Sequence, residues 1–205
     1  MRPLLVISFR LGAAPLFFLL LYDAPCVHGD VSLILSRPAL SLPATQFPPI
    51  DRNDKTRCTM VSSTIGQANG ARDKLIDFRE CNMAGQTADG KDMSGMIALG
   101  ADFSGISFRE AQISKANARN SKFVGCDFTN SVNDRVSFDG ADLSKAVFAN
   151  AVLTGTSFVD ANLKDTDFTD AYIGSFDLKA LCLNPTLEGT NPTTKVDTRE
   201  SVGCP

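Results

Sequence analysis

The sequence contains very little histidine, with a single residue, His28, among 205. It also has no tryptophan and only two tyrosines. His28 lies near the end of an amino-terminal segment with the composition of a removable targeting signal, so the mature chain is expected to have no histidine. This disfavours Ser-His-Asp and Cys-His nucleophilic catalysis and histidine-ligated zinc, although chemistry by carboxylates, lysine or cysteine stays open.

The sequence also lacks an excess of positive charge. With 20 basic and 23 acidic residues, the net charge is −3, which argues against a basic protein that binds nucleic acid. Charged residues make up 21% of the chain and apolar residues 43%, so most of the chain is expected to fold. We predict no nucleic-acid partner, no cofactor, no metal and no catalytic residue.

No apolar run near the amino terminus is long enough to cross a bilayer. The run at 11–22 has 12 residues, whereas a transmembrane helix needs roughly 20. Arg2 and Arg10 flank a short apolar core, and this pattern predicts a secretory-type signal over 1–29. A membrane anchor or a buried strand is the alternative, but Asp23 and Pro25 interrupt the run. No stable membrane span is expected in the mature form.

The next segment, 30–57, is not expected to build a core. Residues 31–49 contain no acid, three serines and four prolines. This composition suits either a linker or a transit segment of the plastid type. A signal followed by a transit-like segment would fit import into a plastid through the secretory route, with secretion or a periplasmic location as the alternative.

The most abundant feature is phenylalanine, with 14 residues, and it follows a five-residue period. From Ile76 to Pro185 the chain divides without a gap into 22 blocks of five. The third residue of a block is Phe, Leu, Ile or Met in 18 of 22 blocks, and the first is Ala, Ser, Thr or Cys in 14. The fifth is Gly, Asn or Asp in 14 of 22.

These preferences predict a coil of short extended segments. Residues i and i+2 of an extended chain face the same side, so the small first and large third residues would face inward together. Residues that tolerate positive φ then turn the chain at the fifth position. A helix would place successive large residues about 140° apart, so it would have no continuous apolar face. The phenylalanines are therefore interpreted as core.

The blocks 101–103, 141–143 and 161–163, which read ADF, ADL and ANL, resemble the A(D/N)L motif of the pentapeptide repeat family. The resemblance implies an all-β fold over 76–185, a right-handed quadrilateral β-helix with four blocks per coil and about 5.5 coils. Residues 20 apart would then stack. One internal ladder is expected from Phe108, Phe128, Phe148 and Phe168.

Three residues depart from the repeat. Gln86 and Lys91 occupy inward first positions, and Lys91 is expected to reach solvent from a loosely formed early coil. Asn133 replaces a large apolar residue and is expected to bond a neighbouring backbone group or to mark a bulge, with a ligand site as the less favoured reading. The irregular segment 58–75 is predicted to cap the first coil, because a solenoid end exposes its apolar cross-section.

The positions of the cysteines indicate that disulfides could fasten the chain at the ends of the predicted coil. Cys182 sits at a predicted outward position and Cys204 is the penultimate residue. A disulfide between them would fasten the tail, 186–205, over the open end and contribute roughly 3 kcal/mol, given an oxidising compartment. Two free thiols are the alternative. Cys58 could pair with Cys81, whereas Cys81 and Cys126 would be too far apart to bridge.

The run at 171–182, AYIGSFDLKALC, with a cysteine near the carboxyl end, is similar to thylakoid-lumenal pentapeptide repeat proteins of plants and algae. That resemblance implies a non-enzymatic interaction or scaffold module of the lumen, whose protein partner could be a photosynthetic membrane complex or its assembly machinery. The alternative is a DNA-mimicking, gyrase-binding pentapeptide protein. However, residues 76–185 carry 15 acids and 10 bases, which is a weak field for mimicking a duplex.

Acidic residues recur at the predicted outward second position of the block. Stacked carboxylates could bind a cation such as Ca²⁺, but a solvated face that keeps the rod soluble is the favoured interpretation. These residues are Asp77, Asp102, Asp127, Asp142, Asp167 and Asp177.

Overall fold

The computed structural model describes residues 47–54, 56–62 and 76–204. Residues from Pro48 onward belong to one compact unit. The predicted signal at 1–29, most of the predicted transit segment and residues 63–75 of the predicted cap lie outside the described residues. The helices of the described part are α1, Ser175–Cys182, and α2, Thr198–Val202.

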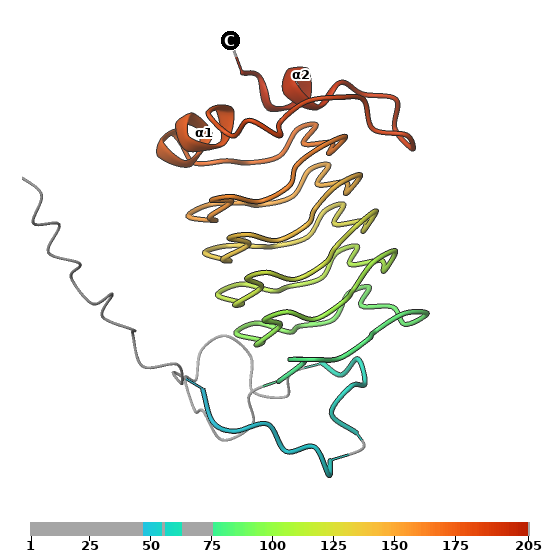
Figure 1. Cartoon of the computed structure of the whole chain (residues 1–205). Coiled ribbons are helices and arrows are strands. Elements are labelled where there is room, and N and C mark those ends of the chain that lie inside the picture. Colours follow the sequence, from blue (N-terminus) through green and yellow to red (C-terminus); the bar gives the residue numbers. More distant parts are fainter. Residues whose placement is uncertain (1–46, 55, 63–75, 205) are drawn as a thin grey trace, which may run out of the picture. The chain divides into compact units, whose positions relative to one another are not determined.

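A parallel coil with a period of 20 residues forms most of this unit (Figure 1). The second residue of each block forms a parallel bridge to the residue 20 positions later, from Asp77 with Ile97 to Val152 with Tyr172. The first bridge uses two backbone bonds: the Phe78 N–H donates to the Ile97 carbonyl at 2.7 Å, and the Ile97 N–H donates to the Ile76 carbonyl at 2.9 Å. Since the bridges are single residues, the coil is built from isolated bridges and turns rather than from long strands.

A tight turn closes each block. The turn is held by a hydrogen bond from the N–H of the next block's first residue to the carbonyl of the third residue. For example, the Cys81 N–H donates to the Phe78 carbonyl at 2.9 Å. The fifth residue has a positive φ in every block from Glu80 to Asp170. The left-handed conformation costs a non-glycine residue roughly 1–2 kcal/mol, yet Lys115 and Arg135 adopt it, at φ of 60° and 56°. The ladder bonds on both sides of the turn therefore override the local preference.

The interior of the coil is a packed column of rings. The stack Phe108, Phe128, Phe148 and Phe168 has successive ring centroids 4.8, 4.6 and 5.3 Å apart. Two shorter stacks stand beside it, Phe103 on Phe123 at 4.9 Å and Phe138 on Phe158 at 5.6 Å. Neighbouring stacks meet edge to face, so each ring contacts others within and between coils.

The coil ends earlier than the predicted boundary at 185. The last parallel bridge is at Tyr172, and the predicted blocks at 176–185 instead contain α1 and its exit. Residues 178–181, LKAL, are strong helix formers, and Ala180 would have had to adopt positive φ in a further turn. The coil is consequently shorter than the expected 5.5 turns. The prediction that Phe176 faces inward is wrong, because its side chain is 83% exposed on α1.

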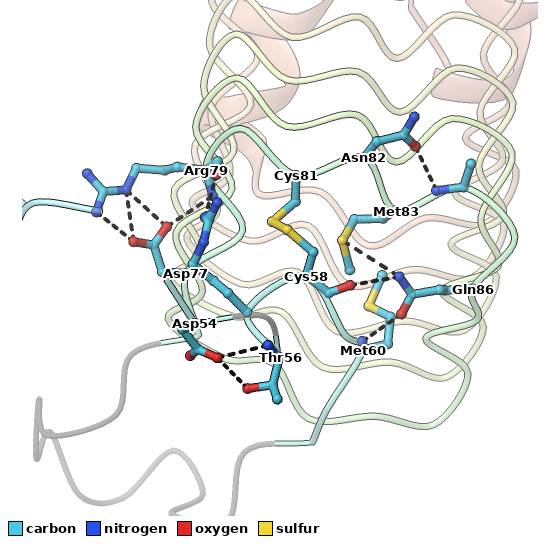
Figure 2. Close-up of a disulfide and its surroundings, with 12 residues drawn as sticks. Asp54, Thr56, Cys58, Met60, Asp77, Arg79, Cys81, Asn82, Met83 and Gln86 are labelled. Carbon is cyan, nitrogen blue, oxygen red and sulfur yellow. Dashed lines mark hydrogen bonds and ion pairs between the residues drawn. A yellow bond between two sulfur atoms is a disulfide. The ribbon is translucent and has the colours of Figure 1, made fainter. Parts of the chain in front are cut away.

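Residues 56–62 close the amino-terminal end of the coil (Figure 2). Cys58 and Cys81 form a disulfide, and Met60 is buried against the first coil. The Gln86 side chain bonds both sides of this segment, donating to the Cys58 carbonyl at 3.0 Å and accepting from the Met60 N–H at 2.8 Å. Gln86 thus breaks the repeat's small-residue preference because it fastens the cap.

Side chains of the tail stand in for a further coil at the other end. The Thr186 hydroxyl accepts from the Leu163 N–H at 2.9 Å and donates to the Ala161 carbonyl at 3.0 Å. The Asn191 amide donates to the Asp165 carbonyl at 2.9 Å, and the Ser201 hydroxyl accepts from the Phe168 N–H at 3.0 Å. These bonds satisfy backbone groups that would otherwise form an open edge able to pair with another chain.

The predicted tail disulfide is present in the structure. Cys182, at the end of α1, and Cys204, beyond α2, are joined with an S–S distance of 2.02 Å. The prediction that Cys182 occupies the outward position of a repeat block is wrong, because Cys182 is the last residue of α1.

Candidate interaction surface

Asn133 and Cys126 are two polar side chains buried inside the coil. Asn133 is fully buried, and its amide nitrogen donates to the Ser131 hydroxyl at 2.7 Å, a side-chain partner instead of the expected backbone group. Its buried amide oxygen has no hydrogen-bond partner among the described residues. Burial raises the pKa of the Cys126 thiol to about 12, and that thiol donates to the Phe103 carbonyl. A thiol with such a pKa is not a nucleophile near neutral pH. Lys91 is partly exposed, as expected for an ammonium that reaches solvent.

The repeated acids do not converge on one another. In the bridge ladder, Lys122 lies between Asp102 and Asp142, and Val147 lies between Asp127 and Asp167. Most of these carboxylates accept the backbone N–H two residues later, as Asp127 does from Thr129 at 2.9 Å. Within the described ranges, no group of three or more His, Cys, Asp or Glu side chains is arranged to hold a metal ion.

Two acids of the series depart from the predicted outward position. Asp167 is buried, with an exposed fraction of 1%. The sixth acid, Asp177, lies outside the repeat. It lies in the first turn of α1, where its carboxylate accepts from the Gly155 N–H at 2.8 Å. This bond ties the start of the helix to the corner of the coil at Gly155. Gly174 precedes the helix, and a Cβ there would lie 2.8 Å from the same carboxylate oxygen, so a side chain at this position would have to displace the Asp177 carboxylate.

Ionic groups on the outer faces form local networks. Asp139 accepts from Arg119, at 3.0 Å, from the Ser137 hydroxyl at 2.8 Å, and from the Ser157 hydroxyl. Partial burial raises the pKa of this carboxyl, but the bonds from Ser157, Ser137 and Arg119 outweigh burial, and the pKa lies below its ordinary value. The network links three successive coils and therefore serves to hold them together.

A groove between α1 and the last coil is a concave surface of the described part. We call it the α1 groove; it has a volume of about 640 Å³ and is lined by residues 155–161, 176, 177, 180, 181 and 183–186. Its rim carries Phe176 and Leu183, each 83% exposed, and Val159, 61% exposed. Large exposed apolar side chains gathered at one place are typical of an interaction site.

The walls of the α1 groove are fixed at several points. Asp177 holds the start of α1, and the disulfide of Cys182 holds its end. Leu181 is buried beneath the helix. Beyond α1, the Asn184 amide donates to the Ala161 carbonyl at 3.0 Å and to the Phe158 carbonyl at 3.3 Å. A groove with anchored walls loses little conformational freedom when a ligand binds.

Sequence reasoning missed this groove because it continued the repeat through α1. Two signals in the sequence mark the change: Gly174 outside the fifth position, and Ala180 where a turn residue was needed. Together they indicate a helix start after Gly174.

Comparison with known proteins identifies the repeat. Residues 100–130 and 134–170 match the description "Pentapeptide repeats", in eight copies. With this match, the ladder of 20-residue coils is identified as a pentapeptide repeat region, and proteins of the pentapeptide repeat family form right-handed β-helices. The family is generally non-catalytic and acts through structure or interaction.

Several solved structures are similar to this chain. A pentapeptide repeat protein from the Arabidopsis thaliana thylakoid lumen is 29% identical over 58% of this chain and 88% of its own, with a TM-score of 0.23. HetL, involved in heterocyst differentiation regulation in the cyanobacterium Nostoc, is 19% identical over 48% and 56%, with a TM-score of 0.23. QnrB1, a plasmid-mediated fluoroquinolone resistance protein, is 21% identical over 42% and 52%, also with a TM-score of 0.23. The chain thus spans about half the length of the last two.

No curated protein matches this sequence significantly. Among the described residues, no helix combines the length and the apolar character that crossing a membrane requires.

Proposed function

We propose that this protein is a non-enzymatic docking module of the thylakoid lumen that binds a protein partner associated with photosynthetic complexes or their assembly. The observation that carries the proposal is the division of the molecule into a filled interior and a polar exterior. The rings, Asn133 and Cys126 are all buried inside the coil, so recognition falls to the outer faces and to the α1 groove.

Two further features support the lumen as the compartment. Disulfides fasten both ends of the described coil, which suits an oxidising compartment. The composition of 1–29 and 30–57 suits a signal followed by a transit segment or linker, and we propose these boundaries for the targeting region. We also propose that the coil has the quadrilateral cross-section implied by four five-residue blocks in each 20-residue turn.

The compartment is tested on the native protein in intact organelles. Protease is added before and after the thylakoid membrane is opened, and free thiols are then alkylated under denaturing conditions. The proposal predicts protection until the membrane is opened, with Cys58, Cys81, Cys182 and Cys204 inaccessible to alkylation without reductant. Recovery from the cytosol with these four thiols free would contradict it.

Gyrase binding by DNA mimicry is the alternative, and the charge of the coil argues against it. Ladder positions mix acids with bases and apolar residues, as in Asp102, Lys122 and Asp142. Protection of gyrase from a quinolone by a stoichiometric amount of the full chain would favour this alternative over the lumenal role.

A further inference from the structure

The α1 groove combines an apolar rim with acidic lining. Among the described residues that line it, the ionisable side chains are Asp160 and Asp177, and no lining residue is basic. Asp160 is exposed at a turn of the last coil, whereas Asp177 is committed to the Gly155 N–H. Asp160 is therefore the charge that faces an incoming ligand.

Two bases close to the groove, Arg135 and Lys179, do not line it. Arg135, whose side chain lies under Gly155, pairs with Asp134 at 2.7 Å. Lys179 belongs to α1 but is not among the lining residues. A carboxylate beside apolar side chains attracts a cation most strongly where water is partly excluded, so the groove is complementary to a base flanked by apolar groups.

The shape of the groove wall favours a polypeptide segment. The volume of about 640 Å³ lies within the ordinary range of ligand sites, and the apolar side chains along the wall favour an extended or helical peptide as the occupant. Phe176 and Ala180 of α1 and its C-cap residue Leu183 follow helical spacing, i, i+4 and i+7, and all three are exposed, so this segment presents an apolar stripe to the occupant.

We propose that the α1 groove binds a segment of the protein partner in which a lysine or arginine lies between large apolar side chains. The base pairs with Asp160, and the apolar side chains pack on Phe176, Leu183 and Val159. The inference rests on the proposed docking function and names the surface and the partner chemistry. The anchoring of α1 by Asp177 and by the disulfide of Cys182 keeps the groove formed before binding.

The test uses the full chain and three short fluorescent peptides: one of leucine and lysine, one with glutamate in place of lysine, and one with serine in place of leucine. Fluorescence anisotropy gives each affinity. The leucine–lysine peptide should bind more than about tenfold tighter than either of the others. Equal binding of the glutamate peptide, or of the serine peptide, would overturn the proposal.

Variants locate the binding. The double variant Phe176→Ser with Leu183→Ser should weaken the leucine–lysine peptide by more than about tenfold, since two apolar contacts are lost. Asp160→Asn should remove the preference for lysine over glutamate. Tyr172→Ser is the matched control, because Tyr172 is 67% exposed but does not line the groove. Undiminished binding by the double variant, or an equal loss in the control, would overturn the proposal.

Two further measurements separate this inference from the proposed function. Sedimentation without peptide tests whether a second copy fills the groove, and a dimer abolished by the double variant would overturn the partner assignment. Affinity purification from opened lumen compares the wild-type chain with the double variant. A protein recovered equally by the wild-type chain and the double variant would overturn the proposal for the α1 groove but not the docking function. If neither chain recovered a protein, the docking function itself would be contradicted.

Discussion

Substitution of Phe148 gives the sharpest test that the phenylalanines form the packed interior of the coil. Its side chain is fully buried, with ring centroids 4.6 Å from Phe128 and 5.3 Å from Phe168. It also meets Phe138 and Phe158 edge to face, at 6.0 and 6.2 Å. Phe148→Ala therefore removes a ring from the middle of the stack, and rigid coils above and below prevent collapse of the cavity.

We expect Phe148→Ala to lower the free energy of unfolding by about 3–5 kcal/mol. Phe148→Leu refills most of the volume and should cost less than half as much. Phe176→Ala is the matched control, because the same substitution at an 83% exposed site should change stability by less than about 0.5 kcal/mol. Urea unfolding followed by circular dichroism measures all three, since the chain has no tryptophan. Equal costs at Phe148 and Phe176 would refute the inward assignment.

The amino-terminal cap, the buried thiol and the surface carboxylates each give a further prediction. Replacing Cys58 and Cys81 by serine opens a loop with a sequence separation of 23 and should cost about 3 kcal/mol in urea unfolding; no loss in the oxidised protein would contradict the cap. Cys126 should resist iodoacetamide at pH 8 in the folded chain and react once unfolded, by mass spectrometry of its peptide; rapid native alkylation would count against burial. Because the pKa of Asp139 is lowered on folding, its stabilisation is full above about pH 4 and is lost as pH falls through the folded pKa. Asp139→Asn should therefore reduce the fall in melting temperature as the pH is lowered below about 4. An unchanged fall would show that the Asp139 carboxylate does not stabilise the coil.

The coil could be predicted from the sequence because each position of the five-residue block has its own residue preference, set by whether it faces inward, faces outward or forms the turn. Phe108 and Phe148 had to face inward, and the structure stacks them in the expected column. The turn at the fifth position was harder to predict from residue type. Glu110 and Lys145 adopt positive φ although neither residue prefers it, because the ladder imposes the turn.

The carboxyl-terminal region was harder to predict because its contacts are long-range. Asn191 bonds to backbone groups more than 20 residues away, and Asn184 does the same, so neither role leaves a periodic trace. The α1 groove depends on the end of the repeat at Gly174, which five-residue counting passed over. Gln86 shows the converse case, since it looked like a defect in the repeat and in fact fastens the cap.

The most direct test of the docking function is cross-linking in intact thylakoid lumen with an amine-reactive reagent. Exposed lysines lie along the outer surface of the coil and on α1, at Lys115, Lys122, Lys145, Lys164 and Lys179. A docking module should give reproducible cross-links from some of these lysines to one or a few other lumenal or membrane proteins. Cross-links confined to the chain itself, at native abundance and with the reagent shown to reach the lumen, would contradict the account.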